Sequence, residues 1–194
     1  MNIQFIFGII ASLLFVTSII WYVYDVAKGR VRVAITSVIM LALINFSQLG
    51  ALIAKELWYV VPFTLVAGVM NILIVAFGIK NGKFQFKLLD AIVLIGALAG
   101  LVVWHLTKDA AYNIYILTAV MLISVIPMFM KTFKDPTRET KLPWLVNLAA
   151  TVVLAMTITS LQPIDWLVQA RQVVLSVLMN LAIHQKASRA DSKA

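Results

Sequence analysis

The sequence predicts an all-α integral membrane protein with seven transmembrane helices, and two observations carry this prediction. Of the 194 residues, 62% are hydrophobic and 12% are charged, whereas a soluble domain has roughly 45–50% apolar and about 25% charged residues. The apolar residues also gather into stretches of about 20, the length that a helix needs to cross a bilayer. An ordinary soluble enzyme and a disordered chain are therefore excluded, and the absence of cysteine excludes a disulfide scaffold.

Seven apolar stretches supply the predicted spans, all within one transmembrane domain over residues 1–194. They run over Ile3–Tyr24, Val33–Ile53, Trp58–Ile79, Leu89–Leu106, Ala110–Met130, Leu142–Leu161 and Trp166–Ile183. The first stretch follows no basic segment and precedes no small-residue cleavage site, so we expect an uncleaved span rather than a signal peptide. The short joints Ala54–Leu57 and Thr107–Asp109 require tight antiparallel hairpins.

The basic residues give the predicted bundle an orientation. If all seven stretches span, thirteen of the sixteen Lys and Arg residues fall on one side of the membrane, against Lys55 and Lys108 on the other. Basic residues near span ends are retained in the cytoplasm. We therefore expect the N-terminus outside, residues 184–194 as a cytoplasmic tail, and a multi-pass location in a bacterial inner membrane. The net charge of +8 then serves orientation and contact with membrane lipids, and no nucleic-acid partner is expected.

Two pairs of similar segments predict an internal repeat. Ser18–Tyr22 ends the first span and resembles Ser124–Met128, which ends the fifth span 106 residues later. Asn71 in the third span and Asn180 in the seventh have similar apolar neighbours at a separation of 109 residues. An odd number of intervening spans makes the two repeats parallel, in a three-one-three plan. The expected units are repeat one over residues 3–79, a linker helix over 89–106 and repeat two over 110–183.

This three-one-three plan, with an external N-terminus and paired asparagines, resembles the SWEET and PQ-loop superfamily of small membrane transporters over nearly the whole chain. Pro127-Met128, followed by Lys131, Lys134 and Arg138, is similar to the PQ motif, with methionine in place of glutamine. The resemblance implies a divergent bacterial transporter that moves a small solute by alternating access.

Asn71 and Asn180 are the predicted solute-binding pair. They lie thirteen and fourteen residues after Trp58 and Trp166, which places both about 20 Å from the outer end at 1.5 Å per residue. Equal depth is what a shared central site requires.

Other polar residues share faces with this pair. Thr64 lies on the face of Asn71, and Gln172 and Ser176 lie on the face of Asn180. Amides and hydroxyls at these places would bind an uncharged, sugar-like, vitamin-like or nucleoside-like solute. The alternative is hydrogen bonding and close packing between helices, which we favour for Thr64 and Ser176.

Three residues near the inner ends of spans are candidates for a gate. Pro127 removes a backbone donor in the fifth span and predicts either a hinge or a plain kink. Trp21 and Tyr22 are expected either in the inner vestibule or in the interfacial aromatic belt, where Trp144 is also expected.

Further polar and small residues have mainly structural interpretations. Asn45 and Asn147 are expected to bond neighbouring helices. Arg171 is expected to snorkel to the outer interface or to pair with Asp165, with attraction of anions as the alternative. Gly96 and Gly100 predict a close helix contact or a dimer interface; the oligomeric state stays open.

The sequence predicts no catalysis and no cofactor. No His cluster has the spacing of metal ligands, and no phosphate-binding loop is present, so we expect neither an enzyme nor a metal site. All eight acidic residues fall in joints, tails or span ends, which favours facilitated diffusion over proton coupling. A non-transporting scaffold, sensor or complex subunit on the same fold is the alternative function.

Overall fold

The computed structural model describes residues 3–31, 33, 35–79, 86, 88–136 and 139–191, with side chains up to residue 184. This part of the chain is helical, with turns and loops between the helices and no strand. The helices are α1 (Ile3–Ala27), α2 (Ile35–Ala54), α3 (Val61–Gly78), α4 (Leu88–Thr107), α5 (Ala110–Ser124), α6 (Ile126–Lys134), α7 (Lys141–Ala155) and α8 (Pro163–Asp191).

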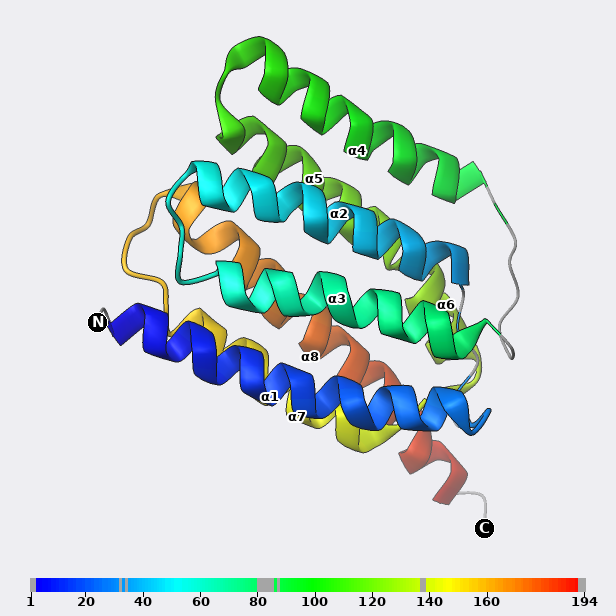
Figure 1. Ribbon diagram of the computed structural model, residues 1–194. Helices are drawn as coiled ribbons and strands as arrows, with labels where there is room; N and C mark the ends of the chain where they lie inside the picture. Colours follow the sequence, from blue (N-terminus) through cyan, green and yellow to red (C-terminus); the bar gives the residue numbers. More distant parts are fainter. Residues whose placement is uncertain are drawn as a thin grey trace.

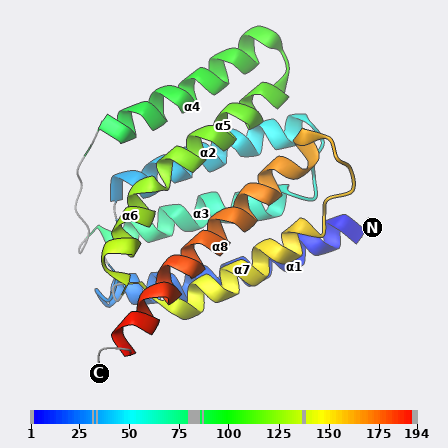
Figure 2. The same ribbon diagram turned by 180° about the vertical axis from the view of Figure 1, so that it is seen from behind.

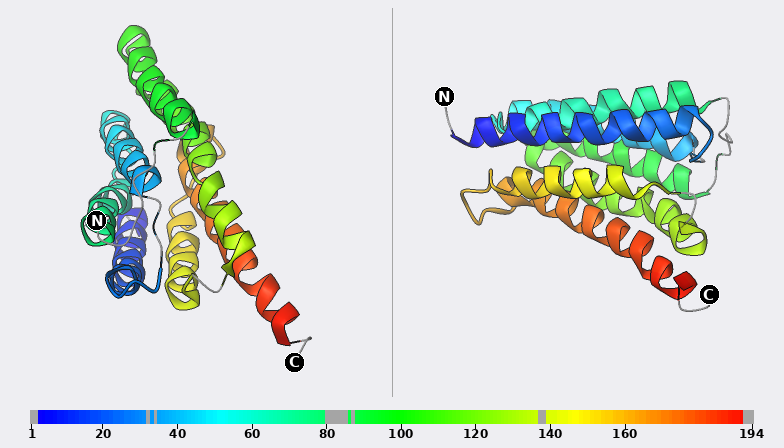
Figure 3. Two further views of the ribbon diagram at one scale, coloured as in Figure 1. Left: turned by 90° about the vertical axis from the view of Figure 1, so that its right-hand side faces the viewer. Right: turned by 90° about the horizontal axis from the view of Figure 1, so that it is seen from below.

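The helices form two layers of three, the additional helix α4, and the short helix α6, which follows α5 and packs against α8. In one layer α3 packs between α1 and α2, and in the other α8 packs between α5 and α7. The layers meet where α1 packs against α7 and α2 packs against α5, and α4 lies outside, against α5 and α2 (Figures 1 and 3). The chain begins at one end of this bundle and α8 finishes at the other (Figure 2); we call these the N-terminal and C-terminal ends.

Among the described residues, six helical segments are long and apolar enough to cross a membrane, which indicates a multi-pass membrane protein. They are α1, α2, α3, α4, the α5–α6 pair and α8. The remaining apolar helix, α7, has only 15 residues. The all-helical membrane fold was therefore predicted correctly, while α7 is shorter than a standard span.

The predicted sixth span, Leu142–Leu161, is wrong at its C-terminal end. The helix ends at Ala155, and the Thr157 hydroxyl donates to the Leu154 carbonyl at 2.7 Å. Hydroxyl side chains that bond nearby backbone compete with helix continuation. Pro163 then starts α8, three residues before the predicted start of the seventh span, because proline suits the first turn of a helix.

The predicted fifth span is interrupted. Helix α5 ends at Ser124 and α6 begins at Ile126, with Val125 between them. Pro127 has no backbone N–H, and its ring would clash with the carbonyl four residues earlier in a continuous helix. The sequence-based expectation of a kink or loosening at Pro127 is therefore confirmed.

The basic residues are only partly described. Lys28, Arg30, Lys131, Lys134 and Lys141 lie at the C-terminal end, and Lys55 and Lys108 lie at the N-terminal end. The other basic residues of the predicted cytoplasmic side lie outside the described residues or their described side chains: Arg32, Lys80, Lys83, Lys87, Arg138, Lys186, Arg189 and Lys193. Of the predicted tail, residues 184–191 continue helix α8.

Glycines allow α4 to approach α5 closely, as the sequence predicted. A Cβ atom at Gly96 would lie 2.5 Å from Cγ2 of Val120, and one at Gly100 would lie 2.5 Å from Oδ1 of Asn113. A side chain at either position would require Val120 or Asn113 to shift, or the two helices to separate.

Gly96→Leu is therefore expected to lower the free energy of unfolding by about 1–3 kcal/mol, the usual cost of overpacking. Denaturation of the purified protein in detergent, followed by circular dichroism, measures this effect. Ala99→Leu is the control, because Ala99 lies on an exposed face of the same helix. Equal stability of the two variants would contradict the close contact.

Candidate functional site

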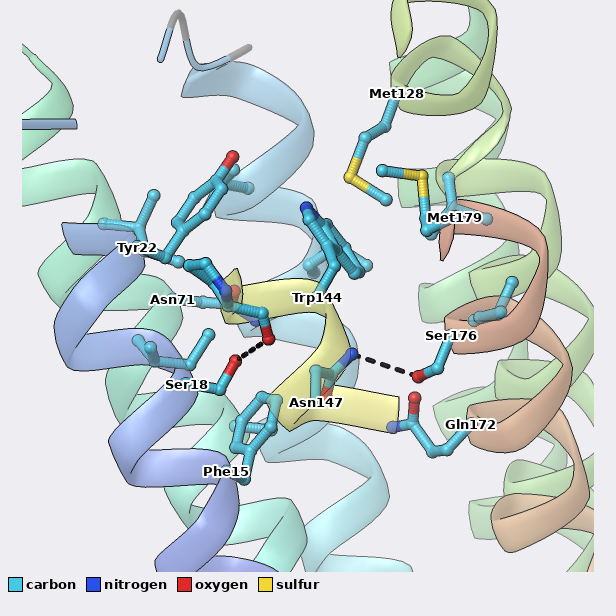
Figure 4. Close-up of a pocket in the computed structure, with 18 of the residues that line it drawn as sticks. Phe15, Ser18, Tyr22, Asn71, Met128, Trp144, Asn147, Gln172, Ser176 and Met179 are labelled. Carbon is cyan, nitrogen blue, oxygen red and sulfur yellow. Dashed lines mark hydrogen bonds between the residues drawn. The ribbon is translucent and has the colours of Figure 1, made fainter. Parts of the chain in front are cut away.

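A cavity of about 150 Å³ lies between the two layers and is lined by residues from both (Figure 4). Its polar lining consists of Ser18, Tyr22, Asn45, Asn71, Trp144, Asn147, Gln172 and Ser176. Pockets for drug-sized ligands begin at roughly 300 Å³. The cavity therefore suits a small solute or a few water molecules.

Four amide side chains from four helices face this cavity: Asn45 of α2, Asn71 of α3, Asn147 of α7 and Gln172 of α8. The Asn45 amide donates to the Leu41 carbonyl at 2.8 Å, within its own helix. The Asn147 amide donates to the Ser176 hydroxyl at 3.0 Å, across α7 and α8 (Figure 4).

The amide oxygens are less well satisfied than the amide nitrogens. Oδ1 of Asn45 and Oδ1 of Asn147 are buried and have no hydrogen-bond partner in the described part of the chain. Buried polar atoms without a partner are rare in proteins and commonly mark a bound water or ligand. The two oxygens are therefore available as acceptors for a polar solute.

Aromatic side chains border the cavity toward the C-terminal end. The rings of Tyr22 and Trp144 pack edge to face, with centroids 6.4 Å apart and planes at 79°. Nearby, the Ser18 hydroxyl donates to the Pro143 carbonyl at 2.6 Å and joins α1 to α7. Trp144 therefore lines the cavity, which corrects its predicted place in the interfacial belt.

A layer of buried side chains separates the cavity from the N-terminal end. The rings of Phe15 and Phe63 lie 4.8 Å apart. One turn beyond the cavity, every helix except α4 and α6 contributes a side chain that is at most 4% exposed: Ala11, Gln48, Phe63, Thr118, Ala150 and Arg171. We call these six residues the plug.

Arg171 is the centre of a hydrogen-bond network within the plug. Its Nη2 donates to Oε1 of Gln48 at 3.1 Å, and its Nη1 donates to the Thr118 hydroxyl at 3.5 Å. Arg171 is 4% exposed, so its predicted snorkelling to the outer interface is wrong. Its predicted partner Asp165 instead accepts hydrogen bonds from Tyr59 and Ser160.

Two contacts tie the loops together at the N-terminal end. Lys55 Nζ lies 2.6 Å from Oδ1 of Asp109, and this hydrogen bond lowers the pKa of Asp109. The Tyr59 hydroxyl donates to Asp165 at 3.3 Å, and burial together with Asp165 raises the pKa of Tyr59 to about 12. The connection after α2 is thereby tied to the connection after α4 and to the first turn of α8.

At the opposite end, Glu139 lies in the predicted joint before α7 and is buried. Glu139 is 7% exposed, and burial raises the pKa of its carboxyl group, an effect that Lys131 partly offsets. Lys131 Nζ lies 3.3 Å from Oε1 of Glu139.

The predicted solute-binding residues occupy different places. Asn71, Gln172 and Ser176 line the cavity. Thr64 is buried and lies outside its lining. The Asn180 amide donates to the backbone carbonyls of Trp144 at 2.8 Å and Ser176 at 2.9 Å. Asn180 therefore joins α8 to α7 and does not meet Asn71 across the cavity.

The predicted gate residues also lie in different places. Tyr22 lines the cavity, whereas Trp21 is half exposed and borders a separate surface pocket. Pro127 lies beside the helix break, between the cavity-lining residues Val125 and Met128.

Asn45, Asn147 and Trp144 line the cavity, although the sequence predicted only structural roles for them. The predicted bond between helices is confirmed for Asn147, which donates to Ser176, and is wrong for Asn45, whose amide bonds its own helix. One signal could have found the two asparagines. They lie in the second and sixth spans at a separation of 102 residues, close to the separations of the other repeat pairs.

The fold and the site together define a multi-pass helical membrane protein with an amide-lined internal cavity. In the described part of the chain, no group of three or more His, Asp or Glu side chains could hold a metal ion. No protein-family model, curated protein or solved structure matches this chain.

Proposed function

We propose that this protein is a transporter of the bacterial inner membrane that facilitates movement of a small, polar, uncharged solute by alternating access. The observation that carries the proposal is the cavity between the layers, where four amides converge and two buried amide oxygens have no partner among the described residues. A sugar, nucleoside or vitamin-like solute would supply the missing hydrogen-bond donors. The proposed chemistry needs no catalytic group and no cofactor.

The packing of the helices supports two parallel repeats joined by α4. The contact of α1 with α3 corresponds to that of α5 with α8, and the contact of α2 with α3 corresponds to that of α7 with α8. Exchanging the two sets of helices also converts the α1–α7 contact into the α5–α2 contact. Such a twofold relation is what membership of the SWEET and PQ-loop superfamily implies.

The proposed cycle alternates between openings at the two ends of the bundle. In this proposal the plug and the tied loops correspond to a state closed at the N-terminal end, the end that we predict to lie outside from the basic residues of the sequence. Half-buried Tyr22, Met128 and Trp144 border the cavity on the other side. The break at Val125 and Pro127 would act as the inner hinge.

Asn71→Ala is expected to reduce solute uptake into proteoliposomes at least tenfold while the protein still folds. The Asn71 side chain lines the cavity and makes no hydrogen bond to the described residues, so alanine at this position removes no internal side-chain bond. A panel of radiolabelled sugars, nucleosides, vitamins and amino acids identifies the solute, and circular dichroism checks the fold. Ile72→Ala is the control, because Ile72 is 51% exposed on the lipid-facing side of α3.

Asn180→Ala is expected to reduce uptake as well, but through lost hydrogen bonds between α8 and α7, and therefore with lower stability. Uptake at the unmodified rate by both asparagine variants would overturn the assigned site.

A cysteine at position 71 distinguishes a transporter from a scaffold, a sensor or a subunit of a complex. Because the chain has no cysteine, the Asn71→Cys variant carries a single thiol. A wet transport path predicts its reaction with a membrane-impermeant maleimide, and a dry scaffold predicts none.

A further inference from the structure

A second pocket, of about 570 Å³, opens on the surface at the C-terminal end, where α1 and α7 lie side by side (Figures 1 and 2). Its lining has two chemically different parts. Ile20, Trp21 and Leu142 are apolar side chains that are 44–56% exposed. Arg30, Lys141 and Thr140 supply charge and a hydroxyl group.

The charged part of this pocket is net positive. Arg30 is 60% exposed and pairs at 3.1 Å with Asp25, the carboxylate in the lining. Lys28 lies 4.5 Å from the centre of the Tyr24 ring, which also borders the pocket. With Lys141, three cations thus stand beside one carboxylate. The net positive charge therefore favours an anionic ligand, which would lie away from the Asp25 carboxylate because that group repels it.

The start of α7 adds unused hydrogen-bonding groups to the pocket. Thr140 precedes the helix, and its side chain makes no capping hydrogen bond. Its hydroxyl oxygen is buried and has no partner in the described part of the chain. The first backbone N–H groups of a helix lack internal partners and attract negative charge, phosphate above all.

The position of the pocket selects an amphipathic ligand. The basic residues follow the apolar helix α1 or begin α7, so they lie where a span meets water. Trp and Tyr side chains at this depth are typical of the interface between hydrocarbon and headgroups. A ligand that fits both parts carries a phosphate on an acyl-chain body.

We propose that this pocket binds an anionic phospholipid, whose phosphate is held by Arg30, Lys141 and Thr140 and whose acyl chains lie against Ile20, Trp21 and Leu142. The site is independent of the proposed transport activity. Because α1 and α7 belong to different layers, the bound lipid would also hold the two layers together at this end.

Native mass spectrometry of the full chain tests the proposal, with dioleoyl-phosphatidylglycerol and dioleoyl-phosphatidylcholine supplied at equal concentration. We expect phosphatidylglycerol to be retained at least fivefold more than phosphatidylcholine. The Arg30→Gln, Lys141→Gln double variant is expected to lose this preference. The Lys55→Gln, Lys108→Gln variant is the matched control: it removes the same charge at the opposite end and should keep the preference.

Arg30→Gln releases Asp25 from its ion pair, so Lys141→Gln alone is the second variant should the double variant fail to fold. Equal retention of the two lipids would overturn the proposal. If the double variant folds, an unchanged preference for phosphatidylglycerol in Lys141→Gln would also overturn it. A thermal shift in soluble glycerol phosphate as large as that in phosphatidylglycerol would also overturn it, because the site would then take free phosphate rather than a lipid.

Discussion

Gln48→Leu is expected to lower the free energy of unfolding by about 3 kcal/mol, the upper range for a hydrogen bond to a charged group. The change removes the acceptor of the shorter hydrogen bond made by Arg171 and leaves that guanidinium buried beside the Thr118 hydroxyl alone. A buried cation without sufficient partners is among the most costly groups in a membrane bundle. Unfolding of the purified protein in mixed micelles with increasing SDS measures the loss.

A double variant tests the reason for this loss. Arg171→Met with Gln48→Leu removes both polar groups, and well-packed apolar replacements of buried polar clusters are often neutral or stabilising. The double variant should therefore be more stable than Gln48→Leu alone. If the double variant loses as much stability as Gln48→Leu and Arg171→Met lose in sum, the network between Arg171 and Gln48 does not exist as described.

Asn45→Leu is expected to reduce solute uptake at least tenfold, equivalent to about 1.4 kcal/mol of transition-state stabilisation, without loss of stability. The Asn45 amide bonds only the Leu41 carbonyl of its own helix, and its Oδ1 is buried without a partner in the described part of the chain. Leucine of similar size removes that unsatisfied oxygen. Thermal unfolding should thus occur at the same temperature or higher while transport falls.

A fall in transport without a fall in stability identifies Asn45 as a group that binds solute rather than one that stabilises the fold. Leu43→Ala is the control on the same helix, because Leu43 is 48% exposed toward lipid. Unchanged uptake by Asn45→Leu would mean that the amides of the cavity do not contact the solute. A clear fall in stability would assign Asn45 to helix packing.

The sequence was sufficient for the positions of most helices because a membrane span has one dominant requirement, a long apolar stretch. Local hydrogen-bonding chemistry decided the exceptions. Thr157 and Pro163 determine where α7 ends and α8 begins, and neither interrupts the apolar pattern strongly enough to shift a hydropathy-based boundary. Pro127 was recognisable because its effect on a helix is local.

The site was less predictable, because a buried polar side chain has two possible uses that the sequence does not distinguish. Asn180 bonds the backbone of α7, whereas Asn147 both bonds Ser176 of α8, as predicted, and lines the cavity with a buried oxygen that has no partner in the described part of the chain. Depth along a helix was informative for Asn71, but only the packing of six helices decides which side chains meet. The burial of Arg171 likewise depends on Gln48 and Thr118, which come from other helices.

The shortness of α7 has a consequence for the surrounding bilayer. Fifteen helical residues extend about 22 Å at 1.5 Å each, whereas the hydrocarbon core is about 30 Å thick. Hydrophobic mismatch of this kind draws headgroups and water inward beside the short helix. A helix of this length that crosses the membrane should therefore thin the bilayer locally along α7.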